Sequence, residues 1–170
     1  GPAWADATMI CPWTTYLCYG DRSLLAAHYD SMKRFMDFME KKRTKNFIRM
    51  HPDLGLWTGF GDWLALDGGG KIDGITPHDL IGTAFYAYDA EIMTKVADLL
   101  GRKEDAKQYR FLHGEIVKAF RRRYVTPDGL VVSGTQTAYA VALQFGLIDE
   151  STRATAANEL ARHVKQKDYH

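Results

Sequence analysis

Indole rings lie close to carboxylates at residues 4–6 and 57–63 of this sequence, and an imidazole adjoins a carboxylate at 78–79. The residues are Trp4, Asp6, Trp57, Asp62, Trp63, His78 and Asp79. The C–H faces of a pyranose pack on aromatic side chains, and its hydroxyl groups form hydrogen bonds with carboxylates. If the fold gathers these segments at one end of the molecule, they predict a sugar-binding site.

Some of these residues also have a purely structural interpretation. Asp62 is of a type that is common in turns. His78 begins a helix, where a capping or solvent-exposed position competes with a role in binding, and Asp79 suits the positive end of the helix dipole. Trp13 lies in an apolar stretch and is expected in the core rather than in the site.

Helices are expected to position these residues, because apolar residues recur at three- or four-residue spacing along most of the chain. The predicted helices cover about residues 6–19, 24–39, 80–99, 106–124, 136–145 and 151–164. Leu130–Val132 suggests a short extended segment after a turn. Gln136 begins one helix behind the N-cap candidate Thr135, and we expect its amide to face a ligand.

The connections indicate how the helices are arranged. Gly20, Gly101 and Gly146 each follow a helix where a left-handed cap is needed, and Asp21 and Asp149 are N-cap candidates for the next helix, with Ser151 an alternative to Asp149. These tight hairpins alternate with long connections at 43–76 and 125–135. Tight turns at one end and long loops at the other are typical of helical toroids and solenoids, and the lack of a repeating consensus favours a toroid.

The long connection at 43–76 is too aromatic for a solvated linker. We predict that it folds back over one end of the helices, and that Gly59 and Gly61 let the chain approach a ligand closely. Gly68–Gly70 is predicted to be a mobile tip.

Composition excludes several classes of partner. Hydrophobic residues make up 46% and charged residues 25% of the 170 residues, so a globular domain is expected. The net charge is +1, so neither nucleic acid nor a membrane is an expected partner. No apolar run reaches membrane-spanning length. Cys11 and Cys18 lie about 10 Å apart along one predicted helix, too far for a disulfide, and are predicted to be buried. The sequence has no motif for a metal or a cofactor, and none is expected.

Short runs along almost the whole chain carry a family resemblance. They are Pro-Ala-Trp-Ala-Asp-Ala at 2–7, Pro-Trp-Thr at 12–14, Tyr-Gly-Asp at 19–21, Gly-Asp-Trp-Leu at 61–64, and further runs at 79–86, 120–124, 127–129, 135–139 and 145–147. In this order they resemble the helical toroid of bacterial α-L-rhamnosidases (glycoside hydrolase family 78).

The resemblance implies an all-α fold that is part of an (α/α)6 toroid of the six-hairpin glycosidase type. Residues 1–170 would form a single partial domain, the central portion of the catalytic domain. The implied reaction removes terminal α-L-rhamnose from glycosides with inversion, which needs an acid and a base carboxyl about 6.5–9.5 Å apart. In the family the acid precedes the Trp-x-Asp-Ala run and the base lies beyond residue 170, so this chain is expected to lack both and to be inactive alone.

Carried over to this sequence, the resemblance places Trp4, Asp6, Asp62 and Trp63 in a pocket for a rhamnose-containing oligosaccharide or glycoside. Two alternatives stay open. One is another six-hairpin glycosidase, either an unsaturated glucuronyl hydrolase, which would need basic residues beside its aromatic rings, or a trehalase-like enzyme. The other is a non-catalytic helical-repeat interaction module. Because an incomplete toroid exposes hairpin faces, either self-association or the remainder of a longer chain is expected to cover them.

Overall fold

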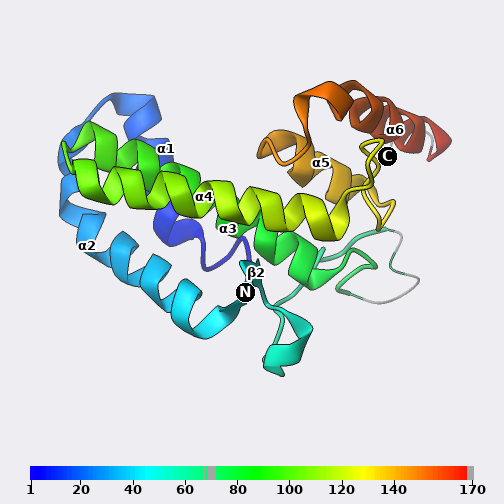
Figure 1. The fold of residues 1–170 in the computed structure, drawn as a ribbon, viewed down its shortest axis with the longest axis horizontal. Helices are drawn as coiled ribbons and strands as arrows, with labels where there is room; N and C mark the ends of the chain where they lie inside the picture. Colours follow the sequence, from blue (N-terminus) through cyan, green and yellow to red (C-terminus); the bar gives the residue numbers. More distant parts are fainter. Residues whose placement is uncertain (67, 69–71, 168–170) are drawn as a thin grey trace.

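The computed structural model describes residues 1–66, 68 and 72–167, and it confirms the predicted helical fold (Figure 1). The helices are α1 (Ala7–Tyr19), α2 (Arg22–Phe38), α3 (His78–Leu99), α4 (Lys103–Tyr124), α5 (Gln136–Gln144) and α6 (Arg153–Gln166). Two of the three glycines of the predicted tip, Gly69 and Gly70, lie outside the described residues. Among the described residues, no helix is long and apolar enough to cross a bilayer.

Three helical hairpins build the molecule, and α3 lies at their centre. It packs along α4, and it also contacts α1, α2 and α5. Figure 1 shows the tight turns of the first two hairpins side by side at the left, and the long connection that leads into α3 at the other end of α3. The alternation of tight and long connections therefore predicted the arrangement of these hairpins.

Left-handed glycines end the helices as expected. Gly20, Gly101 and Gly146 have φ angles of 70°, 72° and 66°. The Asp21 carboxylate accepts a hydrogen bond from the backbone N–H of Ser23 at 2.8 Å, which confirms it as the N-cap of α2. The hydroxyl of Thr135 accepts from the backbone N–H of Ala138 and caps α5 in the same way.

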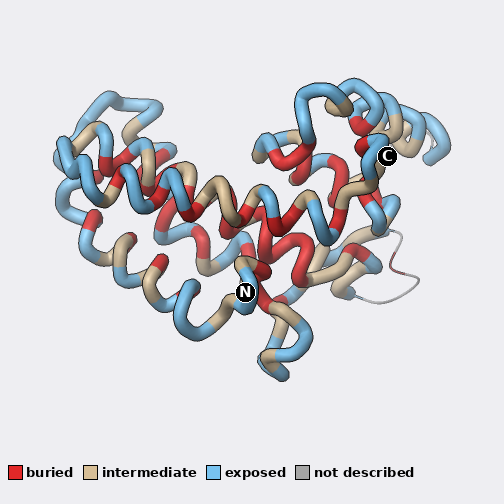
Figure 2. Tube along the Cα trace, viewed as in Figure 1, coloured by how far each residue is buried: buried red, intermediate tan, exposed pale blue. Residues whose placement is uncertain are grey.

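The core follows α3. Buried positions concentrate on this helix and on the sides of its neighbours that face it (Figure 2). Most residues of α3 are buried, including two aspartates and a threonine: Asp79, Leu80, Ile81, Gly82, Thr83, Ala84, Tyr86, Ala87, Asp89, Ala90, Ile92, Met93, Val96 and Ala97. A helix buried on nearly all sides has no polar stripe, and a buried aspartate in it needs a partner within the protein if it is to stay charged.

A small β-hairpin between α2 and α3 was not predicted. The π-helical turn η1 (Met39–Arg43) leads into β1 (Thr44–Lys45), which pairs antiparallel with β2 (Ile48–Arg49). The two loop residues, Asn46 and Phe47, both have positive φ, as a two-residue hairpin turn requires. The 3-10 turn η2 (Pro52–Leu54) follows, and a second 3-10 turn, η3 (Glu150–Thr152), precedes α6.

Two smaller predictions had different outcomes. Val131, in the predicted extended segment, is buried and forms an isolated β-bridge with Val125. The prediction that the cysteines are buried was wrong, because Cys11 and Cys18 are both exposed. The buried face of α1 is occupied by Met9, Pro12 and Trp13.

Candidate functional site

Four exposed aromatic rings gather where the N-terminal segment meets the long connection. Phe60 is at the centre: its ring centroid lies 5.7 Å from that of Trp4, 5.0 Å from that of Trp57 and 5.0 Å from that of Trp63. Trp57 and Trp63 meet Phe60 edge-on. Trp4 remains 65% exposed, Trp57 56% and Trp63 47%. We call these four residues the ring cluster.

The ring cluster brings together three of the predicted site residues. Trp4, Trp57 and Trp63 were singled out in the sequence, whereas Phe60, which contacts all three, was not. The available signal was the three-residue spacing of aromatic residues at positions 57, 60 and 63 in a glycine-rich loop. Because exposed apolar patches of this kind mark binding surfaces, the ring cluster is the strongest candidate for contact with a ligand.

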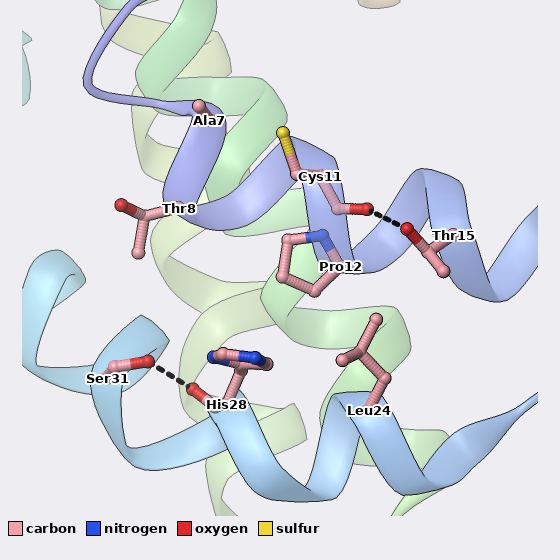
Figure 3. Close-up of a pocket in the computed structure, with 8 residues that line it drawn as sticks. All are labelled: Ala7, Thr8, Cys11, Pro12, Thr15, Leu24, His28 and Ser31. Atoms are coloured by element: carbon pink, nitrogen blue, oxygen red, sulfur yellow. Dashed lines mark hydrogen bonds between the residues drawn. The ribbon is translucent and has the colours of Figure 1, made fainter.

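A hollow adjoins the ring cluster on the side of Trp4. Ala3, Trp4 and Ala7 line a space of about 330 Å³. Ala7 also lines a second hollow of about 480 Å³, which follows the groove between α1 and α2 past Cys11 to Leu24 and His28 (Figure 3). Trp4 therefore presents its ring beside a concave surface.

Asp62 is held by hydroxyl groups. Its carboxylate accepts hydrogen bonds from the side chains of Thr76 and Thr137. Thr76 in turn lies 2.8 Å from the hydroxyl of Thr135, the N-cap of α5. These bonds join the long connection to the start of α5, where Gln136 is the first helical residue. The structure thus places Asp62 and Gln136 in the same region, and a role in ligand binding for either residue stays a prediction.

His78 ties the long connection to the first turn of α3. Its Nδ1 lies 2.9 Å from the hydroxyl of Thr58, and its Nε2 lies 3.5 Å from a carboxylate oxygen of Asp73. Gly61 packs so closely on the imidazole that a Cβ at this position would overlap Nε2. His78 is half-buried by these contacts, and a part in binding a ligand stays a prediction.

The close approaches at the two predicted glycines are made within the chain. Gly59 has φ of 92°, and a Cβ there would lie 2.6 Å from the ring of Pro2; Gly61 packs against His78. These contacts let the long connection pack against the N-terminal segment and α3, which fixes the backbone from which the rings project. A close approach of either glycine to a ligand stays a prediction.

Asp79 does more than interact with the helix dipole. It is buried and accepts hydrogen bonds from Nε and Nη2 of Arg123 at 3.2 and 2.9 Å. This ion pair links the start of α3 to the end of α4. Arg123 also donates to the hydroxyl of Tyr124, whose pKa is raised mainly by burial and also by the charge of Asp79.

Asp6 follows Trp4 by two residues and is fully buried. One carboxylate oxygen accepts a hydrogen bond from Nη1 of Arg49 at 2.5 Å, and the other accepts from the backbone N–H of Ala3 at 2.6 Å. Arg49 is also fully buried, and its Nη1 lies 3.7 Å from Asp89 of α3. In this structure Asp6 therefore faces an arginine rather than the hollow beside Trp4. A contact with rhamnose stays a prediction.

The predicted carboxylates have partners within the protein, whereas the rings are exposed. The three predicted carboxylates are each engaged by the protein: Asp6 by Arg49, Asp62 by Thr76 and Thr137, and Asp79 by Arg123. Within the described residues, no three side chains of the metal-binding types converge as they would around an ion. The surface offers apolar rings next to a hollow.

Comparison with known proteins agrees with this fold. The family model of the bacterial alpha-L-rhamnosidase six-hairpin glycosidase domain matches residues 1–170. An alpha-L-rhamnosidase of Streptomyces avermitilis is 36% identical over 169 residues, and one of Formosa agariphila is 35% identical over 170 residues. Each match covers 98% of this chain, but only 15% and 18% of the respective relative.

A solved structure shows the same arrangement of helices. The crystal structure of the Streptomyces avermitilis alpha-L-rhamnosidase complexed with L-rhamnose superposes with a TM-score of 0.82 at 34% identity, over 96% of this chain and 14% of that protein. The chain thus corresponds to a small part of much longer proteins. Its sequence and its fold agree, and it belongs to the bacterial alpha-L-rhamnosidase six-hairpin glycosidase domain family.

Proposed function

We propose that this chain supplies the aromatic wall of the sugar site in an inverting α-L-rhamnosidase. The observation that carries the proposal is the ring cluster, in which three tryptophans remain about half exposed or more around Phe60. Membership of the rhamnosidase family indicates the sugar. The substrate is then a terminal α-L-rhamnoside, either an oligosaccharide or another glycoside.

The chemistry of L-rhamnose suits such a wall. Rhamnose is a 6-deoxyhexose, so it carries a methyl group where other hexoses carry a hydroxymethyl group, and like other pyranoses it has C–H faces. Aromatic rings pack against these apolar groups, and edge-on contacts with Phe60 keep the indoles of Trp57 and Trp63 from collapsing onto one another. Asp62 and Gln136, at the junction with α5, are the polar groups that we propose for the sugar hydroxyls.

We further propose that the catalytic carboxyls belong to other parts of the complete enzyme. An inverting glycosidase needs one protonated carboxyl on the leaving oxygen and one carboxylate on the attacking water. The predicted carboxylates of this chain already have partners within the protein, and Asp6 is buried in an ion pair. The chain would then bind and orient the sugar while the acid and the base act from elsewhere in the enzyme.

Titration with L-rhamnose tests the binding role directly. The sugar should change the tryptophan fluorescence with a dissociation constant on the order of millimolar, as expected for a monosaccharide on part of a site. D-rhamnose, the mirror image, is the matched control and should produce a smaller change. A response equal for both enantiomers, or none at about 50 mM, would contradict the proposal.

Two tryptophan variants show which indoles produce the fluorescence response to L-rhamnose. Trp13 is buried in the core beside α3, so Trp13→Phe should leave the L-rhamnose signal in place. Trp63→Ala should remove most of the signal, because it takes one exposed indole from the ring cluster. If Trp13→Phe abolished the response and Trp63→Ala did not, the sugar would bind elsewhere.

A further inference from the structure

Three charged side chains meet in the core from three separate elements. Asp6 precedes α1, Arg49 ends β2, and Asp89 lies in the middle of α3; each is at most 1% exposed. We call these residues the buried triad. It contains two carboxyl groups and only one guanidinium. Because an uncompensated charge is very unfavourable in a protein interior, one of the two carboxyls must hold a proton.

The contacts assign that proton to Asp89. Asp6 accepts two hydrogen bonds, one from Arg49 and one from the backbone of Ala3. Neither oxygen of Asp89 has a hydrogen-bond donor among the described residues. Burial, followed by the charge of Asp6, raises the pKa of Asp89 well above its ordinary value. Asp89 therefore keeps the proton, and Asp6 is the carboxylate that pairs with Arg49.

Asp6 uses its second oxygen to shape the backbone just before it. The Ala3 N–H donates to this oxygen, and Ala3 has φ of 65°, a left-handed conformation that is unfavourable for alanine. The next residue is Trp4, which packs against Phe60 and lines the hollow. The carboxylate thus holds the turn that sets the direction of the Trp4 side chain.

Arg49 connects this turn to the most buried helix. Its backbone N–H donates to the hydroxyl of Thr83 at 3.1 Å, and Thr83 donates to the carbonyl of Asp79 within α3. Gly82 of α3 packs near the carbonyl of Arg49 and near Pro2, because it has no side chain to keep them apart. A continuous set of contacts therefore runs from α3 through Arg49 and Asp6 to Ala3 and Trp4.

We propose that Asp6 and Arg49 are positioning residues, which hold the Trp4 ring in the ring cluster without contacting the sugar. The inference rests on the proposed function only in taking the ring cluster as the sugar-binding surface. It assigns to Asp6 a role different from the direct contact that its place beside Trp4 suggests.

The two carboxyls of the buried triad provide a matched test. Asp6→Asn removes the charge that faces Arg49, so the indole N–H signal of Trp4 should shift in NMR spectra and its through-space contacts with the Phe60 ring should weaken. Asp89→Asn replaces a neutral carboxyl with a neutral amide of the same shape, and it should leave both observations unchanged. In each variant the indole signal of Trp13 should report an intact core.

A second substitution that restores the Trp4 contacts distinguishes a positioning role of Asp6 from general destabilisation. Ala3→Gly lets the left-handed turn form without strain, so adding it to Asp6→Asn should restore the Trp4–Phe60 contacts, whereas it cannot repair the core. If Asp6→Asn does not fold, the double variant Asp6→Leu/Arg49→Met leaves no charge in the triad and should fold with a displaced Trp4. An unmoved Trp4 in a folded Asp6 variant, an equal shift in Asp89→Asn, or no rescue would overturn the inference.

Sugar binding is measured separately on the same variants. Asp6→Asn should weaken L-rhamnose binding about five-fold, the factor that corresponds to the strain of one left-handed alanine. The NMR contacts need no sugar. If the wild-type chain does not bind L-rhamnose but Trp4 moves in Asp6→Asn, the proposed function fails and the positioning role stands. If the wild type binds L-rhamnose but Trp4 does not move in Asp6→Asn, the proposed function stands and the positioning role fails.

Discussion

The α3–α4 hairpin and the long connection before α3 are neighbours, but they are stabilised in different ways. The hairpin buries continuous apolar faces, and its central residues, such as Ile92, Ile116 and Phe120, have no exposed surface. The connection has little regular structure, and it is held by single polar contacts, at His78 and Asp62, and by glycines that fit against neighbouring backbone. The exposed rings lie on the second region. A rigid hairpin thus supports a binding surface whose shape depends on a few specific contacts.

The largest effect on stability is expected in the hairpin. Phe120→Ala should lower the free energy of unfolding by about 3–5 kcal/mol, because it opens a cavity in a fully packed core. Phe111 on the same helix is 69% exposed, and Phe111→Ala should change the same quantity by less than about 0.5 kcal/mol. Urea denaturation measures both. Similar values for the two variants would mean that the hairpin is not packed as described.

The second prediction concerns the centre of the ring cluster. Phe60→Ala should cost only about 1–2 kcal/mol of stability, since the ring is partly exposed and its contacts with three indoles are the main loss. It should nevertheless remove most of the fluorescence response to L-rhamnose. On one preparation, denaturation measures the free energy of unfolding and titration with L-rhamnose measures the fluorescence response. A variant as unstable as Phe120→Ala would show that the ring cluster belongs to the core.

The third prediction is a dependence of stability on pH that arises in the buried triad. The folded chain keeps a proton on Asp89 that the unfolded chain releases above the ordinary pKa of 3.8. The unfolded state then binds fewer protons, so this group makes the free energy of unfolding fall as the pH rises from 3.8 until the raised pKa is reached. The groups around it are Asp6, Arg49 and the hydroxyl of Tyr86, whose pKa is also raised by burial.

Asp89→Asn removes the titrating group and tests the assignment. Relative to wild type, the variant should become progressively more stable as the pH increases from about 4 to 7. Thermal unfolding at several pH values, with the wild type measured in parallel, gives the difference. A stability difference that does not change with pH would mean that Asp89 is already charged in the folded chain.

The smallest effect concerns a surface away from the ring cluster. At the end of α1, Leu17 is 63% and Tyr19 is 81% exposed, and we expect the isolated chain to self-associate weakly through this apolar surface. Leu17→Glu should raise the dissociation constant of the dimer about ten-fold in sedimentation experiments. Phe111→Glu, on α4, is the control and should not. A monodisperse monomer at all concentrations would contradict the expectation.

Local sequence patterns predicted the helices well. Apolar spacing located the helices within a few residues, and Gly20, Gly101 and Asp21 marked turns and caps because those features depend on residues close together in the chain. The exposed cysteines were missed for a related reason: the buried face of α1 is set by which residues meet α3 and α2, and cysteine is compatible with either side.

The long-range contacts could not be predicted in this way. Arg49 lies in a connection for which no helix or strand was predicted. Its burial depends on contacts with Asp6, which is 43 residues away, and with Asp89. Likewise, the role of Asp62 depends on Thr137, 75 residues along the chain. Trp4, Trp57 and Trp63 were singled out from residue type and spacing, whereas the contact between Phe60 and Trp4 forms only when two distant segments meet.

The glycine turns between paired helices have a practical consequence for engineering. No described atom lies within 4 Å of the position that a side chain would take at Gly20 or Gly101, so only the backbone conformation restricts these sites. Both turns lie at the opposite end of the first two hairpins from the long connection. Fluorescent labels, affinity tags or a new pair of chain ends can therefore be introduced there while the indoles are left free to report on ligands.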